Sequence, residues 1–177
     1  NSKNAQVTIN GGNGSDSITG GFGANDVLNG GGGNDIIVSR GSSDHINGGT
    51  GDDTVEINMT SNPSFPTIIG GGGSDTLVIT DTSDGDGVSI AKDTDYLANH
   101  DVDISNNAGP DSGGVLKTNG FHEIDLGLGS GADALDVGDL QDSSVQILSI
   151  DVGASDNASD SVELDGGAGA DDFTVSG

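Results

Sequence analysis

The chain has 177 residues, with 33 Gly, 26 Asp and no Cys, and its formal net charge is −25. This charge excludes a nucleic-acid-binding surface, which must be basic, and the apolar runs are too short to cross a bilayer. The lack of Cys excludes disulfides, thiolate metal sites and a thiol nucleophile. The first residues lack the basic and apolar segments of a signal peptide. Such a composition suits either a disordered chain or an ordered repeat, so the periodicity decides between them.

Large aliphatic residues recur every nine or ten positions over the first third of the chain. They have polar neighbours, and this alternation predicts very short strands that each point one side chain inward. We therefore expect these residues to form the core: Ile9, Ile18, Leu28, Ile37, Ile46 and Val55.

Glycine-rich turns with an acid at the sixth position lie between alternate aliphatic anchors. Complete Gly-Gly-x-Gly-x-Asp sequences occupy residues 11–16, 30–35, 48–53, 70–75 and 166–171, and an apolar residue follows two positions after each acid. A partial copy at 128–133 has Leu128 in place of the first Gly. The unit is therefore a nonapeptide, G-G-x-G-x-D-x-U-x, with U a large apolar residue.

This nonapeptide resembles the RTX, or hemolysin-type calcium-binding, repeat family. Residues 124–133 also resemble strand-and-turn segments of large secreted bacterial surface proteins that carry such repeats. The resemblance implies an all-β fold, a right-handed parallel β-roll or β-helix solenoid with calcium in its glycine-rich turns. We expect a regular RTX β-roll over 1–79. Over 80–177 we expect an irregular β-helix continuing the same solenoid, with RTX-like turns near 127–136 and 166–175.

The turn composition also predicts a calcium site on chemical grounds. Glycine allows the chain to reverse tightly and leave carbonyl groups free, and an Asp adds a carboxylate. Calcium takes six to eight such oxygen ligands, whereas zinc or copper favours nitrogen or sulfur. The candidate ligands, several Ca²⁺ ions being expected, are Gly11, Asn13, Asp16, Gly30, Gly32, Asp35, Gly48, Thr50, Asp53, Gly70, Gly72, Asp75, Asp133, Gly166, Ala168 and Asp171.

A second series of acids, Asp26 and Asp44, is spaced by 18 residues and falls on the opposite edge of the same coils. We include both as metal ligands, but Ala24 and Ser42 stand where the pattern has its third Gly. A side chain at that position is expected to strain or widen the turn and to weaken metal binding.

The remaining sequence is less regular. Residues 58–67 contain Pro63 and Pro66 and predict a loop that leaves one coil. The acidic segment Asp81–Tyr96 is expected to be a solvated loop. Short alternating runs predict further strands at Thr76–Thr80, Val88–Ala91, Val102–Ile104, Phe121–Leu126, Val145–Ile150 and Ser161–Leu164.

These features favour a structural role over catalysis. No Ser lies in a nucleophile elbow, and one Tyr with four Phe offers little for a polysaccharide-degrading β-helix. Charge repulsion and one buried aliphatic per repeat predict a chain that folds only when calcium binds. We therefore expect a calcium-stabilised segment of a secreted bacterial surface layer, adhesin or filament, located outside the cell. The alternative is the secretion and folding module of a type I-secreted exoenzyme or toxin.

Self-association is the expected partnership, either with a second copy or with neighbouring repeats of a longer chain. Both ends of the sequence read as strands without a capping helix, as in a solenoid segment whose ends stack. Ile36, Val38 and Val78 are expected to face outward from one sheet, where a second solenoid could contact them.

Overall fold

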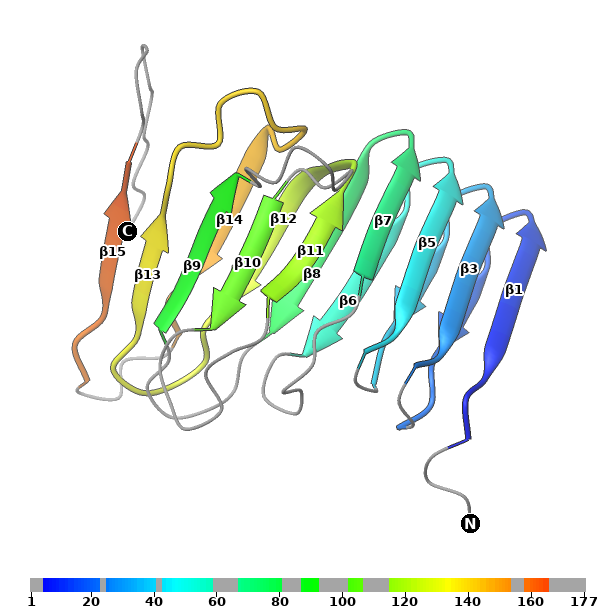
Figure 1. Cartoon of the computed structure of the whole chain (residues 1–177), viewed down its shortest axis with the longest axis horizontal. Coiled ribbons are helices and arrows are strands. Elements are labelled where there is room, and N and C mark those ends of the chain that lie inside the picture. The colour runs from blue at the N-terminus through cyan, green and yellow to red at the C-terminus, as the bar shows by residue number, and fades with distance from the viewer. Residues whose placement is uncertain are drawn as a thin grey trace.

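The computed structural model describes residues 5–22, 25–40, 43–58, 67–80, 87–92, 102–106, 115–153 and 158–165. Within these ranges every regular element is a strand, and no helix that could cross a membrane is present. Two sheets lie face to face along the length of the molecule, and the chain winds between them from one end to the other (Figure 1). The predicted all-β solenoid is confirmed.

The larger sheet contains nine strands in the order β1-β3-β5-β7-β11-β10-β9-β13-β15. Their bounds are β1 (Thr8–Asn13), β3 (Val27–Gly32), β5 (His45–Thr50), β7 (Thr67–Gly72), β9 (Gly87–Lys92), β10 (Val102–Asn106), β11 (Val115–Asn119), β13 (Ala134–Val137) and β15 (Ser161–Leu164). The smaller sheet contains six strands in the order β14-β12-β8-β6-β4-β2. Their bounds are β2 (Ser17–Thr19), β4 (Ile36–Val38), β6 (Thr54–Asn58), β8 (Asp75–Thr80), β12 (Phe121–Gly127) and β14 (Ile147–Asp151).

The first eight strands form regular right-handed parallel coils, as the repeat predicts. Each coil runs along the nine-stranded sheet, turns into the six-stranded sheet and returns (Figure 1). The anchors of successive coils are in register, Leu28 with Ile46 in one sheet and Ile37 with Val55 in the other. One nonapeptide therefore supplies one short strand and one turn.

Burial confirms the predicted core. Five of the six anchors are at most 4% exposed, and Ile9 is half-buried at the first strand. The period of two is seen within β4, where Ile37 is fully buried and its neighbour Ile36 is 47% exposed. The core is thus a single column of aliphatic side chains between the two sheets.

The middle of the chain departs from the parallel β-helix that the sequence predicts. The short runs at Val88–Ala91 and Val102–Ile104 are strands, as expected, but β10 is antiparallel to both β9 and β11. After β8 the chain re-enters the nine-stranded sheet at β9 and returns toward β7 through β10 and β11. It resumes parallel coiling with β12. Because β9 lies inside the segment Asp81–Tyr96, the prediction of a continuous loop there is wrong.

The parallel stack resumes in the C-terminal part. β12 pairs with β8 and β14, and β13 pairs with β9 and β15, all of them parallel. β6 ends and β7 begins at the residues that bound the predicted proline loop, whereas residues 59–66 lie outside the described ranges, as do residues 166–177.

Candidate metal-binding turns

We call first edge the side of the solenoid where strands of the nine-stranded sheet turn into the six-stranded sheet. Its four repeat turns are residues 11–16, 30–35, 48–53 and 70–75. The second edge is the opposite side, where the chain returns through residues 20–26, 39–44 and 127–133. The complete repeats that the structure describes therefore all lie on one edge.

The main chain of each first-edge turn requires glycine at two positions. The second and fourth residues have φ between 107° and 136°, a region that side chains avoid. Successive turns also stack by hydrogen bonds, since the N–H of Gly33 donates to the carbonyl of Thr50 at 2.7 Å. The third-position carbonyls keep a second lone pair for another ligand.

The acids at the sixth position form a continuous ladder along the first edge. One carboxylate oxygen of each accepts the N–H of the acid one coil earlier: Asp35 Oδ1 from Asp16, Asp53 Oδ1 from Asp35, and Asp75 Oδ1 from Asp53, at 2.8, 2.8 and 2.9 Å. Asp35, Asp53 and Asp75 are at most 1% exposed. These carboxylates therefore lie inside the protein rather than in solvent.

The other carboxylate oxygen has no donor. Oδ2 is buried and accepts no hydrogen bond in Asp16, Asp35, Asp53 and Asp75. Burying a charged oxygen without a partner is costly, so an oxygen of this kind is suited to a cation or a proton. The same arrangement recurs at four successive turns, which makes it a property of the repeat.

Main-chain carbonyls lie close to these oxygens. A Cβ on Gly11 would lie 2.6 Å from Asp16 Oδ2 and 2.6 Å from the carbonyl oxygen of Gly30 in the next coil. Gly30 and Gly48 are placed in the same way against Asp35 and Asp53. The first glycine of the turn therefore leaves open a space into which a carboxylate and a carbonyl oxygen both point.

This arrangement raises the pKa of two of the acids. Burial raises the pKa of Asp53, and the charges of Asp75, Asp35 and Asp52 raise it further against the opposing hydrogen bond from the Asp35 N–H. Burial likewise raises the pKa of Asp75, partly offset by the Asp53 N–H and by His122. Both shifts mean that the turns disfavour negative charge unless a cation is bound.

The residues of the first edge fit calcium. Among the described residues no three His, Asp or Glu side chains come together as a cluster. The turns instead bring together a hard, donor-free carboxylate oxygen and, beside Gly11, Gly30 and Gly48, a main-chain carbonyl of the next coil, and calcium sites use both kinds of oxygen. Zinc would require nitrogen or sulfur ligands, which these turns do not offer.

The second edge is built differently. Both carboxylate oxygens of Asp26 accept hydrogen bonds, from the N–H groups of Val7 and Gly21 at 2.8 and 3.1 Å. Asp44 accepts the Asp26 N–H at 2.9 Å and the hydroxyl of Ser39 at 2.6 Å. Neither acid has the donor-free oxygen of the first edge.

The sequence predicts backbone strain on the second edge at Ala24 and Ser42, which lie outside the described residues. Positive φ occurs at the fifth position of each turn, 63° at Asn25 and 60° at Ser43. Asn adopts this left-handed conformation more readily than other non-Gly residues.

The partial repeat also lies on the second edge. Gly129 and Gly131 have φ of 86° and 123°, so the turn keeps the repeat's two glycine positions even with Leu128 in first place. Asp133 is 2% exposed, and its N–H donates to Asp160 Oδ1 at 3.1 Å. Asp160 therefore occupies the acid position of the next coil. The predicted ligands Gly166, Ala168 and Asp171 lie outside the described residues.

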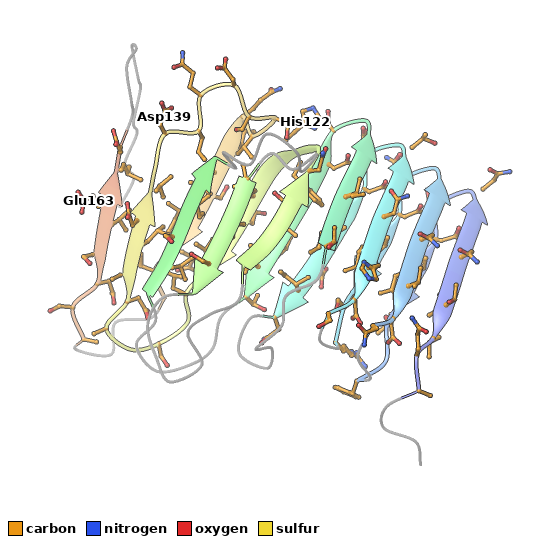
Figure 2. The ribbon with its side chains drawn as sticks, viewed as in Figure 1. His122, Asp139 and Glu163 are labelled. Carbon is orange, nitrogen blue, oxygen red and sulfur yellow. The ribbon has the colours of Figure 1, made fainter. Side chains whose placement is uncertain are left out.

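Sequence reasoning did not single out Asp160 or His122. His122 occupies the ladder position after Asp75, whose N–H donates to His122 Nδ1 at 3.4 Å. In Figure 2, His122 lies at the upper edge of the solenoid, whereas Asp139 and Glu163 lie nearer its C-terminal end. A usable signal exists for both residues: each stands two positions before an apolar strand residue, Val162 or Ile124, as the repeat acids do.

The fold and these turns together define a β-roll solenoid of the calcium-binding type. The model of the RTX calcium-binding nonapeptide repeat matches the chain in four copies, over residues 8–27, 21–55 and 67–78. These segments are RTX repeats, and RTX repeats bind calcium ions. Such repeats occur in secreted bacterial proteins and typically have structural or calcium-binding roles. No curated protein and no solved structure gave a significant match to the chain.

Proposed function

We propose that the first-edge turns hold calcium through the carbonyl groups of their first and third residues and the carboxylate of their sixth. The observation that carries this is the buried, donor-free Oδ2 at four successive turns. The ligands proposed at these turns are Gly11, Asn13, Asp16, Gly30, Gly32, Asp35, Gly48, Thr50, Asp53, Gly70, Gly72 and Asp75.

Calcium then acts as part of the fold. Bound calcium supplies positive charge and coordination to oxygens that receive no hydrogen bond. With 29 acids against four Lys and Arg, the chain repels itself when it collapses. The strands β2 and β4 bury one aliphatic residue each in the smaller sheet. This burial offsets little of the conformational entropy that the glycine-rich turns lose on folding. The free energy of calcium binding is therefore folding free energy.

Removing calcium tests this coupling. Addition of a chelator to the calcium-loaded chain should abolish its β-sheet circular dichroism, and calcium, but not magnesium, should restore it. Magnesium is the matched control because it dehydrates reluctantly and requires near-ideal octahedral geometry. A β spectrum that persists in chelator contradicts the proposal.

We further propose that the chain is a structural segment of a secreted bacterial surface or extracellular-matrix protein, in which solenoids associate side by side. The outer face of the six-stranded sheet supports this role. It exposes Ile36 on β4 by 47% and Ile147 on β14 by 53%. Val38 on β4 and Val78 on β8 are half-buried on the same face, in the neighbouring row of the sheet, with Glu56 between them. A groove of about 390 Å³ runs beside these valines, bounded by Phe22 and Glu56. Exposed apolar surface of this kind is typical of protein–protein contacts.

Lysine substitution tests the association. The double variant Val38→Lys, Val78→Lys should remain folded and bind calcium but lose lateral assembly by electron microscopy in calcium. The matched control, His45→Lys with Asn47→Lys, adds two lysines to exposed positions of the other sheet and should assemble as the unmodified chain does. Dispersed particles of the unmodified chain at every calcium concentration would contradict the assembly role and favour a secretion or folding module.

A further inference from the structure

Over the regular coils, the two edges of the solenoid satisfy their acids in different ways. At the first edge each buried carboxylate has one oxygen in the ladder and one without a donor. At the second edge Asp26 and Asp44 have the same ladder bonds, but their other oxygens accept hydrogen bonds from the chain itself. We propose that calcium is restricted to the first edge over the regular coils, and that Ser39 and Gly21 replace the metal at the second edge.

The comparison is close because the acids are otherwise alike. Asp35 and Asp44 are at most 1% exposed, and each accepts the N–H of the preceding ladder acid on Oδ1, at 2.8 and 2.9 Å. They differ at Oδ2. For Asp35 this oxygen faces the α-carbon of Gly30, whereas for Asp44 it accepts the hydroxyl of the 6% exposed Ser39 at 2.6 Å.

At the second edge, position one of the turn supplies the hydrogen bond that takes the place of the metal, through a side chain or through the main chain. Gly30 and Ser39 both stand five residues before their acid. A glycine there leaves space for ligands beside the carboxylate. A serine fills that space and supplies a short hydrogen bond to the charged oxygen, the class of hydrogen bond that is strongest. Gly21 reaches the same result with its main-chain N–H, at 3.1 Å from Asp26 Oδ2.

The main chain of the second edge agrees with this assignment. The second position carries Phe22 and Arg40, whose guanidinium lies 5.7 Å from the Phe22 ring centroid, in place of a positive-φ glycine. Positive φ is found at the fifth position instead.

This inference rests on the proposed calcium function, and its consequence concerns regulation. Over the regular coils, both oxygens of each second-edge acid are satisfied by hydrogen bonds that are independent of calcium, whereas one oxygen of each first-edge acid is satisfied only by the metal. Calcium removal should accordingly release the first-edge turns first, before the second-edge contacts are lost as the chain unfolds.

A matched pair of isosteric variants of the full chain tests the assignment, with calcium counted by titration calorimetry and native mass spectrometry. Asp35→Asn replaces the donor-free oxygen by a neutral amide and should reduce the number of bound calcium ions by at least one. Asp44→Asn keeps the Oδ1 acceptor, and the Ser39 hydroxyl can accept from the new amide group. This variant should bind the same number of ions as the unmodified chain, with a calcium midpoint within about twofold.

Loss of a calcium ion in Asp44→Asn would overturn the inference while leaving the proposed function intact. An unmodified chain that binds no calcium would overturn the proposed function itself, so the two failures are distinguishable.

A gain-of-site variant addresses the role of position one. Ser39→Gly with Arg40→Gly and Ser42→Gly gives this turn the same six residues as Gly70–Asp75. It should show a larger calcium-induced rise in melting temperature than the unmodified chain. An unchanged rise would show that Ser39 is not what excludes the metal.

Discussion

A buried carboxylate oxygen without a hydrogen-bond donor is the smallest feature that ties this fold to a cation. Asp53 and Asp75 illustrate the energetics, because burial raises the pKa of both groups. A raised pKa in the folded state means that folding is opposed by the charged form and helped by protonation. In the absence of metal, a proton is the only other cation that can neutralise these oxygens.

The pH dependence of the calcium-free chain follows from this shift. Because the folded pKa of Asp53 and Asp75 lies above the ordinary value of 3.8, the folded state binds more protons than the unfolded state between these values. Stability should therefore increase as pH falls through the raised pKa values, with the full gain present below 3.8, and this gain should be lost again as pH rises. Circular dichroism in calcium-free buffer should show β signal returning on acidification. The variant Asp53→Asn, Asp75→Asn should show a smaller pH response, and an equal response would contradict this origin.

The glycines at positive φ are a second residue-scale requirement. Gly49 has φ of 118°, and a Cβ there would overlap the carbonyl oxygen of Gly31 in the preceding coil. Gly49→Ala should therefore lower the free energy of unfolding by about 1–3 kcal/mol in saturating calcium, as measured by denaturant titration. Gly127→Ala is the control, because φ is not positive there and its Cβ would meet the Ile79 carbonyl at an ordinary 3.9 Å. Equal losses in both variants would show that the turn conformation is not the cause.

At the scale of strands and turns, the repeat predicts what its own period determines. The anchors, the short strands and the two-edged acid pattern all follow from one polar–apolar alternation and one glycine turn. The reversal through β10 does not follow, because alternating residues suit parallel and antiparallel pairing equally, and partner choice depends on contacts distant in sequence. The strand β13, which follows the partial repeat, is four residues long.

The candidate site was predictable to a similar extent. The acid of each turn could be read from the glycine pattern, and its edge from the spacing of 18 residues between Asp35 and Asp53 and between Asp26 and Asp44. What could not be read is which carboxylate oxygen finds a donor, since that depends on the Ser39 rotamer and on a main-chain N–H. The same reason explains why Asp26 and Asp44 match the pattern in sequence but differ from Asp35 in their contacts.

The inward and outward positions of a single strand provide the element-scale prediction. Ile37→Ala removes a fully buried side chain from the core column and should destabilise the calcium-loaded chain by about 2–4 kcal/mol. Ile36→Ala, one residue away and 47% exposed, should change stability by no more than about 0.5 kcal/mol. Denaturant midpoints at constant calcium measure both. Similar losses would mean that β4 is not held in the register described.

For the whole molecule, the two ends of the solenoid differ in what stabilises them. The first coils have four donor-free carboxylates along one edge and a narrow core. Farther along the smaller sheet the core is wider, since β12 points both Ile124 and Leu126 into it at no more than 2% exposure. Because stability in a solenoid is a sum of units and their interfaces, the two ends need not depend equally on calcium.

Hydrogen exchange should resolve this difference along the chain. After chelator is added to the calcium-loaded protein, amides of β2 and β4 should lose protection before those of β12 and β14. The strands β2 and β4 follow directly from first-edge turns and bury one aliphatic residue each. In β12, Ile124 and Leu126 are buried by apolar packing that does not depend on calcium. Asp35→Asn should accelerate exchange in β2 and β4 even with calcium present and leave β14 unchanged. Loss of protection in all four strands at one rate would show instead that calcium holds the solenoid as a single cooperative unit.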